Sequence, residues 1–244
     1  MKLPFQLAAL SNELLYMILS YVVQSDLVNL CRIRLFHNVA QELLYYEFHG
    51  KSRNIVSFLR TILSNERLAN RVRCVYLGEL IKEHWNRQIS HGEILAAILL
   101  ARLPRVERLD IQTWDQDLDT RHGLRDCLAR RKPFWTLMMP QLTELPFHAP
   151  FLQNVRILSL YAPNCSVFDI AAVFTLPTLR SLHISGIIET PELSQCAFLP
   201  RSNNISTLAL TGTTLSLQTL SQIFFSCVAL EQFAYNSPTD SQIT

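Results

Sequence analysis

The chain has few residues whose types and spacing support catalysis, cofactor binding or metal binding. Its six glycines form neither a GxGxxG turn nor a P-loop, and no GxSxG nucleophile elbow is present. His84 and His91 are seven residues apart, and Cys31 and His37 are six apart; neither spacing matches a zinc site. None of the six cysteines is adjacent to a histidine or lysine that would favour a thiolate. We therefore expect a non-catalytic protein that needs neither a metal nor another cofactor.

Composition is that of an ordinary globular protein. Of the 244 residues, 49% are apolar, and the formal net charge is only +2. This balance lacks the basic footprint of nucleic-acid-binding proteins, and the basic run from Arg121 to Lys132 has no aromatic platform beside it. The cysteines are isolated, which favours a reducing compartment, and the longest apolar run, residues 94–101, is too short to cross a membrane. We expect a cytoplasmic or nuclear protein that binds neither nucleic acid nor membranes.

Residues 10–45 contain three short helical patterns. Ser11 is expected to cap the first helix, with Glu13 in its first turn, and Ser25 to cap the second. Apolar residues then recur at helical steps, at Leu14, Met17, Ile18, Tyr21 and Val22, at Leu27, Leu30, Cys31 and Ile33, and at Phe36, Val39, Ala40, Leu43 and Leu44. A unit of roughly forty residues cannot bury this much apolar surface alone. A second polypeptide is expected to cover part of it.

The same residues resemble an F-box, the module that docks on the Skp adaptor of SCF (Skp–cullin–F-box) ubiquitin ligases. The resemblance rests on Leu10-Ser11-Asn12-Glu13-Leu14-Leu15, Ile18-Leu19, residues 26–33, Phe36 and Leu43-Leu44-Tyr45. It implies adaptor contacts from Leu10, Ser11, Leu14, Ile18, Leu19, Leu27 and Leu30. Ser11 stands where the family usually has proline, so the helix begins with a side-chain cap instead. The alternative is a helical hairpin that only packs on the following domain.

A six-residue pattern, apolar-x-x-apolar-x-apolar, recurs through the rest of the chain. Copies begin at Val72, Val106, Leu142, Val155, Leu179, Ile205 and Leu230. The last four starts, 155, 179, 205 and 230, are 24, 26 and 25 residues apart. Helical patterns lie between copies, at residues 93–103, 168–176 and 217–225. Short strands that alternate with helices must pair in parallel, so we predict an α/β fold with outer helices.

Each copy also resembles the strand motif of leucine-rich repeats, as in Leu179-x-x-Leu182-x-Ile184. The resemblance implies a solenoid of parallel strands. The family's Asn or Cys three residues after the motif is replaced by Pro163, Ile187 and Thr213, so the repeats are degenerate and their loops should lack the usual side-chain ladder. The Leu142 copy lies only 13 residues before the next one and is interpreted as an irregular turn. The alternative is a non-repetitive α/β domain.

Together the two resemblances indicate an F-box/leucine-rich-repeat protein, similar to the divergent fungal members of that group. The expected organisation is an F-box at residues 1–50, a helical connector at 51–70, and degenerate leucine-rich repeats at 71–244. The resemblance implies a substrate receptor for ubiquitin-dependent degradation, whose F-box binds the Skp adaptor and, through it, cullin. The repeats would hold an unknown protein target. The alternative is a non-catalytic interaction scaffold whose N-terminal helices only cap the solenoid.

Target binding is expected on the face of the sheet where residues alternate with the core positions. Small uncharged residues dominate this face in the later copies, and the candidates that stand out are Arg108, Asp110, Tyr161 and His183. Arginine and tyrosine are enriched among binding hot spots. After the last strand, the sequence Asn236-Ser237-Pro238 offers no helix. We therefore expect the last sheet edge to lack a cap or to pair with a partner.

Overall fold

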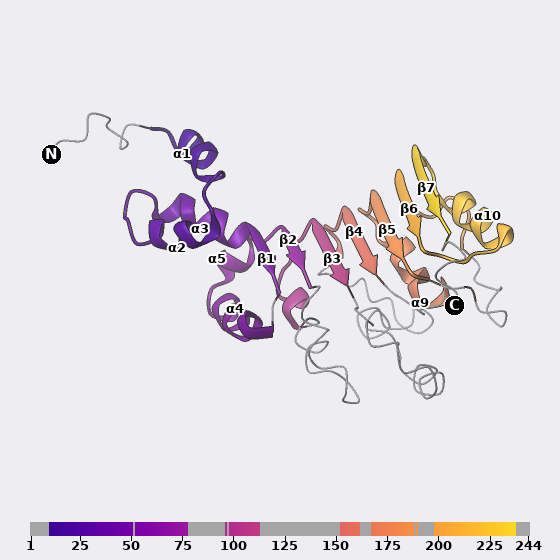
Figure 1. Cartoon of the computed structure of the whole chain (residues 1–244), viewed down its shortest axis with the longest axis horizontal. Helices are drawn as coiled ribbons and strands as arrows, with labels where there is room; N and C mark the ends of the chain where they lie inside the picture. Colours follow the sequence, from indigo (N-terminus) through magenta and orange to yellow (C-terminus); the bar gives the residue numbers. More distant parts are fainter. Residues whose placement is uncertain are drawn as a thin grey trace.

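The structure is a computed structural model that describes residues 10–50, 52–77, 96, 98–112, 152–161, 167–187, 189 and 198–237. Its strands form one seven-stranded sheet in which every neighbouring pair is parallel and spatial order follows chain order (Figure 1). The strands are β1 (Glu47–His49), β2 (Cys74–Tyr76), β3 (Arg108–Gln112), β4 (Ile157–Tyr161), β5 (Ser181–Ser185), β6 (Thr207–Thr211) and β7 (Gln232–Asn236). The predicted α/β class with parallel strands is confirmed.

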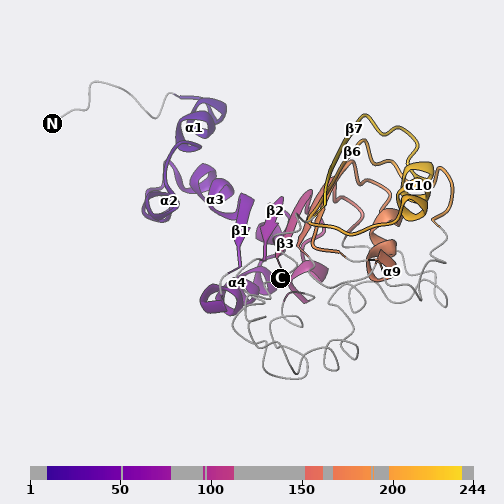
Figure 2. The same ribbon diagram turned by 45° about the vertical axis from the view of Figure 1, so that its right-hand side comes forward.

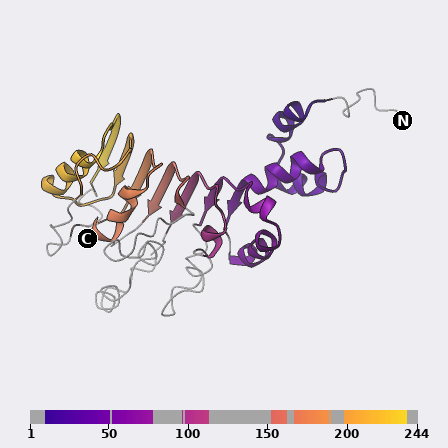
Figure 3. The same ribbon diagram turned by 180° about the vertical axis from the view of Figure 1, so that it is seen from behind.

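The helices divide into an N-terminal group and a group that covers the sheet. Figures 2 and 3 show the first group projecting beyond the β1 edge. The first group is α1 (Asn12–Leu19), α2 (Gln24–Leu30) and α3 (His37–Tyr46). The second comprises α4 (Ser52–Ser64), α5 (Glu66–Ala69), α9 (Val167–Ile170), the 3-10 helix η4 (Ala171–Thr175) and α10 (Leu217–Ser226). Figure 2 shows α9 and α10 on one side of the sheet.

Helix starts follow local capping chemistry in α1 but not in α2. The Ser11 hydroxyl accepts a hydrogen bond from Leu14 N at 3.4 Å, as predicted, and this bond satisfies a backbone donor of the first turn. The cap predicted for Ser25 is wrong, because α2 already begins at Gln24. Its N-cap residue is Val23, which makes no side-chain capping bond.

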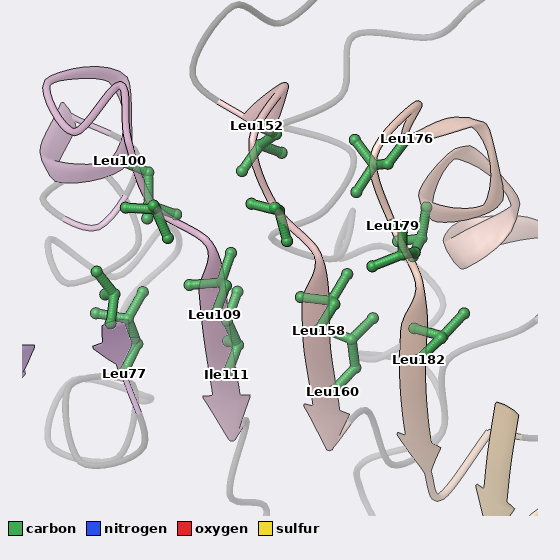
Figure 4. Close-up of a cluster of buried hydrophobic side chains, with 14 of the residues drawn as sticks. Leu77, Leu100, Leu109, Ile111, Leu152, Leu158, Leu160, Leu176, Leu179 and Leu182 are labelled. Atoms are coloured by element: carbon green, nitrogen blue, oxygen red, sulfur yellow. The ribbon is translucent and has the colours of Figure 1, made fainter. Parts of the chain in front are cut away.

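The sheet core consists of the motif positions predicted from the sequence in every described copy but the last, whose Phe233 and Tyr235 are exposed on β7. Figure 4 shows leucines of adjacent strands in parallel rows on one side of the sheet. Each strand from β3 to β6 contributes two core residues, namely Leu109 and Ile111, Leu158 and Leu160, Leu182 and Ile184, and Leu208 and Leu210, all buried. The copies that begin at 72, 106, 155, 179, 205 and 230 are therefore strands; the Leu142 copy lies outside the described residues. Burial of such side chains drives the packing of helices on this face.

The sheet begins earlier in the chain than expected. β1 lies within the segment expected to be the F-box, and its Phe48 is buried in the sheet core. The segment expected to be a connector also belongs to this core, because Ile55, Leu59 and Leu68 are buried and the first two lie in the same cluster as the strands. No independent linker therefore separates α3 from the sheet.

Backbone pairing at the strand starts repeats from one strand to the next. The carbonyl oxygen of the residue before each strand accepts hydrogen bonds from two consecutive N–H groups at the start of the next strand. The acceptors are Arg73, Glu107, Arg156, Arg180 and Ser206, with N···O distances of 2.8 to 3.0 Å. Recurrence of one local geometry at five successive positions means that these units are structurally equivalent.

A side-chain ladder also links the units, at the end of the strands opposite to the one considered in the sequence. Asn154 Nδ2 donates to the Pro104 carbonyl at 2.7 Å, and Asn204 Nδ2 donates to the Pro177 carbonyl at 3.1 Å. Thr178 Oγ1 lies at the equivalent position and donates to the Gln153 carbonyl at 2.6 Å. The repeats therefore do have a ladder, and each rung joins the residue before one motif to the preceding unit.

We expect Asn204→Ala to lower the free energy of unfolding by about 1 kcal/mol, because one neutral hydrogen bond between units is lost. Thermal or urea unfolding measures the effect. Asn154→Ala should cost a similar amount, and the double variant should show the sum, since the two rungs share no partner. An unchanged midpoint in the double variant would contradict the ladder.

At the carboxyl ends of β5 and β6, the chain makes the same turn twice. Gly186 and Gly212 occupy equivalent positions and have φ angles of 85° and 58°, a left-handed conformation that favours glycine. The following residues, Ile187 and Thr213, are completely buried. These are the positions where the repeat family would place its Asn or Cys. Here they fill the core instead of forming a ladder.

Beyond this turn, hydrogen bonds of the Glu189 side chain connect the segment after β5 to the start of α10. Its carboxylate accepts hydrogen bonds from Ser216 Oγ at 2.9 Å, from Thr219 Oγ1 at 2.6 Å and from Ser216 N. Burial alone would raise the pKa of Glu189, but these hydrogen bonds outweigh it and hold the pKa below its ordinary value. The charged carboxylate therefore stabilises the folded state.

The stability contributed by Glu189 should depend on pH with a defined sign. Because its folded-state pKa is lowered, the contribution is present above the unfolded-state value of about 4.3 and is lost as pH falls through the folded-state value. We expect Glu189→Gln to be less stable than the wild type at about pH 7 and the difference to shrink towards about pH 3, measured by thermal unfolding. The exposed Glu231→Gln is the control. A difference that does not change with pH would contradict this role.

Candidate functional site

The N-terminal helices bury one apolar face and expose another. Leu15 and Leu19 of α1 join Leu27, Val39 and Ala40 in a small core that is separate from the sheet core. The opposite face of α1 is open, formed by Leu14, Met17, Ile18 and, just after the helix, Tyr21. Ile18 is 52% exposed and Tyr21 is 90% exposed. We call these four residues the α1 apolar face.

The predicted adaptor-binding residues divide between the surface and the core. Leu14 and Ile18 lie on the α1 apolar face, and Ser11 is exposed at its N-terminal end. Leu10 and Leu30 are partly buried and pack against the small core. Leu19 and Leu27, however, are only 5% and 7% exposed and belong to that core. These two leucines shape the helical unit from inside and present almost no surface to a partner.

Sequence reasoning missed several exposed apolar residues nearby. They are Tyr16 in α1, Val28 in α2, Val23 between these helices, and Ile33 and Leu35 in the turn before α3. Apolar side chains exposed in such numbers on a small unit are typical of a protein-binding surface. The helical periodicity included Ile33 but assigned none of these residues to the docking surface, and Ile33 and Leu35 lie outside the helices.

The helical unit joins the sheet without a linker. α3 ends at Tyr46 and β1 begins at Glu47. The Phe58 ring of α4 stacks on Phe48 at 3.9 Å between centroids and on Tyr45 at 6.0 Å, and Glu42 of α3 forms an ion pair with Arg71. Aromatic stacking and an ion pair across the joint fix the direction in which α3 leaves the sheet.

Strand register places the four predicted target-binding residues on one face of three adjacent strands. Asp110, Ser159 and His183 are consecutive partners across β3, β4 and β5. Arg108 lies two residues before Asp110 on the same face, and Tyr161 lies two residues after Ser159. We call the face formed by these alternating residues the open face. His183 Nε2 is 3.1 Å from Thr211 Oγ1, a hydrogen bond that joins β5 to β6.

An aromatic and charged stack lies at the β1 end of the open face. His49 is hydrogen-bonded to Glu47 at 2.7 Å and stacks on Tyr76 at 4.6 Å between ring centroids. The Arg108 guanidinium lies over the same Tyr76 ring, 5.6 Å from its centroid. Burial and the Glu47 carboxylate raise the pKa of Tyr76, against the opposing effect of Arg108, so the phenol stays neutral.

Sequence reasoning missed this stack because β1 was not predicted. The alternation of Cys74 and Tyr76 around the core residue Val75 was the available signal. Burial raises the pKa of the Cys74 thiol, which disfavours the thiolate. The arrangement therefore offers contacts for a partner rather than a nucleophile.

Metal-binding groups and membrane spans were sought in the part of the chain that the structure describes. It contains no group of three or more His, Cys, Asp or Glu residues that could hold a metal ion. It also contains no helix with the length and apolar character needed to cross a bilayer. Comparisons with known proteins found no matching family model and no matching curated protein.

Proposed function

We propose that this protein is a substrate receptor of an SCF-type ubiquitin ligase, with an F-box at α1–α3 and degenerate leucine-rich repeats in the sheet. The observation that carries the proposal is the α1 apolar face, which remains exposed although the helical unit has its own core. Exposed apolar surface of this kind requires a partner, and the Skp adaptor is the partner that the F-box resemblance implies.

The repeat assignment is supported by structural equivalence between units. The strands follow one another in chain order. At successive strand starts, the carbonyl at the equivalent position accepts hydrogen bonds from two N–H groups of the next unit. A side-chain hydrogen bond to the preceding unit also recurs before three motifs. In repeat proteins, each unit contacts its neighbours and exposes one continuous surface. The open face is the surface proposed to hold the target protein.

The mechanism would be positioning rather than chemistry. Holding a target lysine near an activated thioester on another subunit raises its effective concentration without a catalytic group in this chain. The direct passage from α3 into β1 supports this role, because the docking unit and the open face are joined without a free linker. A receptor of this kind would act in the cytoplasm or nucleus, where cullin ligases operate.

A scaffold whose N-terminal helices only cap the sheet is the second candidate. Its support is limited to α3, which contacts β1 and α5, whereas α1 and α2 pack chiefly on α3. A cap would direct its apolar surface towards the sheet. The α1 apolar face instead lies on a helix that projects beyond the sheet edge (Figures 1 and 3).

Co-expression of the full chain with the Skp adaptor tests the proposal. We expect a 1:1 complex on size-exclusion chromatography with light scattering, and recovery of cullin when it is added. A chain that elutes alone, with an unchanged mass, would contradict adaptor docking. It would leave the scaffold as the better interpretation.

A further inference from the structure

Arginines gather where strands β2 to β5 begin. The backbone bonds described above place Arg73, Glu107, Arg156 and Arg180 side by side, each directly before one of four consecutive strands. Glu107 is the carboxylate of this row and is already paired with Arg73, whose Nε lies 3.2 Å from Glu107 Oε1. Arg156 and Arg180 are exposed just before the adjacent strands β4 and β5, and no ion pair of theirs is found among the described residues. The Arg180 guanidinium donates one hydrogen bond, from Nη1 to the Asn204 carbonyl oxygen at 3.2 Å, and its other N–H groups are left for a carboxylate.

Arg108 adds a fourth guanidinium to this edge. It follows Glu107 directly, is exposed, and is held over the Tyr76 ring. Within the described part of the chain, it too has no ion-pair partner. A guanidinium fixed by an aromatic ring loses less conformational freedom when it binds a carboxylate, which favours affinity.

We propose that Arg108, Arg156 and Arg180 bind an acidic segment of the target, with two or more Asp or Glu residues in an extended conformation. This inference rests on the proposed function and adds the chemical class of the target. Neighbouring strands are about 4.8 Å apart, and same-side residues of an extended segment are about 7 Å apart, a spacing that long arginine side chains span. Arginine binds carboxylates through paired, charge-assisted hydrogen bonds, so the fit is one of charge and geometry.

Arg108 belongs to the open face, whereas Arg156 and Arg180 lie at its edge, one residue before its members Ile157 and Ser181. The rest of the open face orients such a segment. Its residues on β5 to β7 include no Asp, Glu, Lys or Arg; they are Ser181, His183, Ser185, Thr207, Ala209, Thr211, Gln232, Ala234 and Asn236. Acidic residues are therefore attracted to the β3–β5 starts and not to the far end. A target would place its acidic residues at the arginine edge and uncharged residues along β5 to β7.

Fluorescence anisotropy with a labelled peptide tests the inference on the full chain. The probe is an extended peptide of alternating Glu and Ser, compared with the same peptide carrying Gln in place of Glu. We expect the Glu peptide to bind at least about tenfold more tightly, and its affinity to fall as salt is raised. Equal binding of the two peptides, or preference for a phosphoserine peptide with no binding of the Glu peptide, would overturn the proposal.

The double variant R156E/R180E should weaken binding of the Glu peptide by at least about tenfold. The matched control is Arg60→Glu, an exposed arginine of α4 away from this edge, which should bind as the wild type does. If R156E/R180E unfolds, R156Q/R180Q provides the same test without added repulsion. Equal loss in both the edge variant and the control would overturn the proposal. Adaptor binding is read separately through the N-terminal helices, so failure of one proposal is distinguishable from failure of the other.

Discussion

We expect Ile18→Glu to weaken binding of the Skp adaptor strongly while leaving the protein folded. Ile18 is half exposed on the α1 apolar face, so the free chain tolerates a carboxylate at this position. In the complex, the carboxylate would lose its water without gaining an opposite charge or a hydrogen-bond donor. Loss of an apolar anchor at the centre of an interface costs about 2–4 kcal/mol, which corresponds to roughly 30- to 1,000-fold in affinity. Isothermal titration calorimetry with the purified adaptor measures the loss.

Leu63→Glu is the matched control for this experiment. Leu63 is 53% exposed, almost the same as Ile18 at 52%, but it lies on α4 outside the helical unit. The free energy of unfolding of both variants should lie within about 0.5 kcal/mol of the wild-type value, as is usual for substitutions of exposed residues. If the Ile18 variant binds the adaptor as tightly as the wild type does, the proposal that the α1 apolar face binds the adaptor is wrong. Equal loss in both variants would mean that the effect is not specific to α1.

Leu27→Ala should destabilise the helical unit by about 2–5 kcal/mol and leave the sheet folded. Leu27 is buried among Leu15, Leu19, Val39 and Ala40, so truncation removes apolar contacts and leaves a cavity in a core that is already small. A unit of this size has little stability to lose. Hydrogen exchange should show loss of protection in α1–α3 and unchanged protection in β3–β6.

Adaptor affinity should fall in Leu27→Ala for a different reason than in Ile18→Glu. The helical unit is unfolded in the first variant and folded in the second, which hydrogen exchange distinguishes. Leu27 is therefore a poor position at which to test docking alone, although its place in the sequence pattern is typical of an adaptor contact. Full protection of α1–α3 in Leu27→Ala would contradict the existence of a separate N-terminal core.

The sheet could be predicted because its signal is repeated. Each motif places two core residues on one face of a short strand. One copy of the motif is a weak indication of a strand, but its recurrence at similar spacing makes the prediction of the sheet strong. β1 was missed because Glu47-Phe48-His49 contains only one core residue and directly follows a helix. Three residues cannot show an alternating pattern, so its pairing with β2 follows only from the fold.

The proposed docking surface could be predicted only in part, because α1 is apolar on two faces. Leu15 and Leu19 and the pair Leu14 and Ile18 all satisfy helical spacing, and periodicity does not determine which face meets α3. Tertiary packing makes that choice. The open-face candidates were easier, since alternation along a strand assigns each residue to one of two sides.

The order of the strands also determines how the molecule can assemble. Each strand of the sheet pairs with the strand that follows it in the sequence. The sheet can therefore grow strand by strand from an initial nucleus, and residues far apart in the sequence need not meet first. The entropy lost on closing each intervening loop rises only slowly with its length. The number of residues between neighbouring strands therefore has only a small effect on the search, and the repeating architecture tolerates variation in that number.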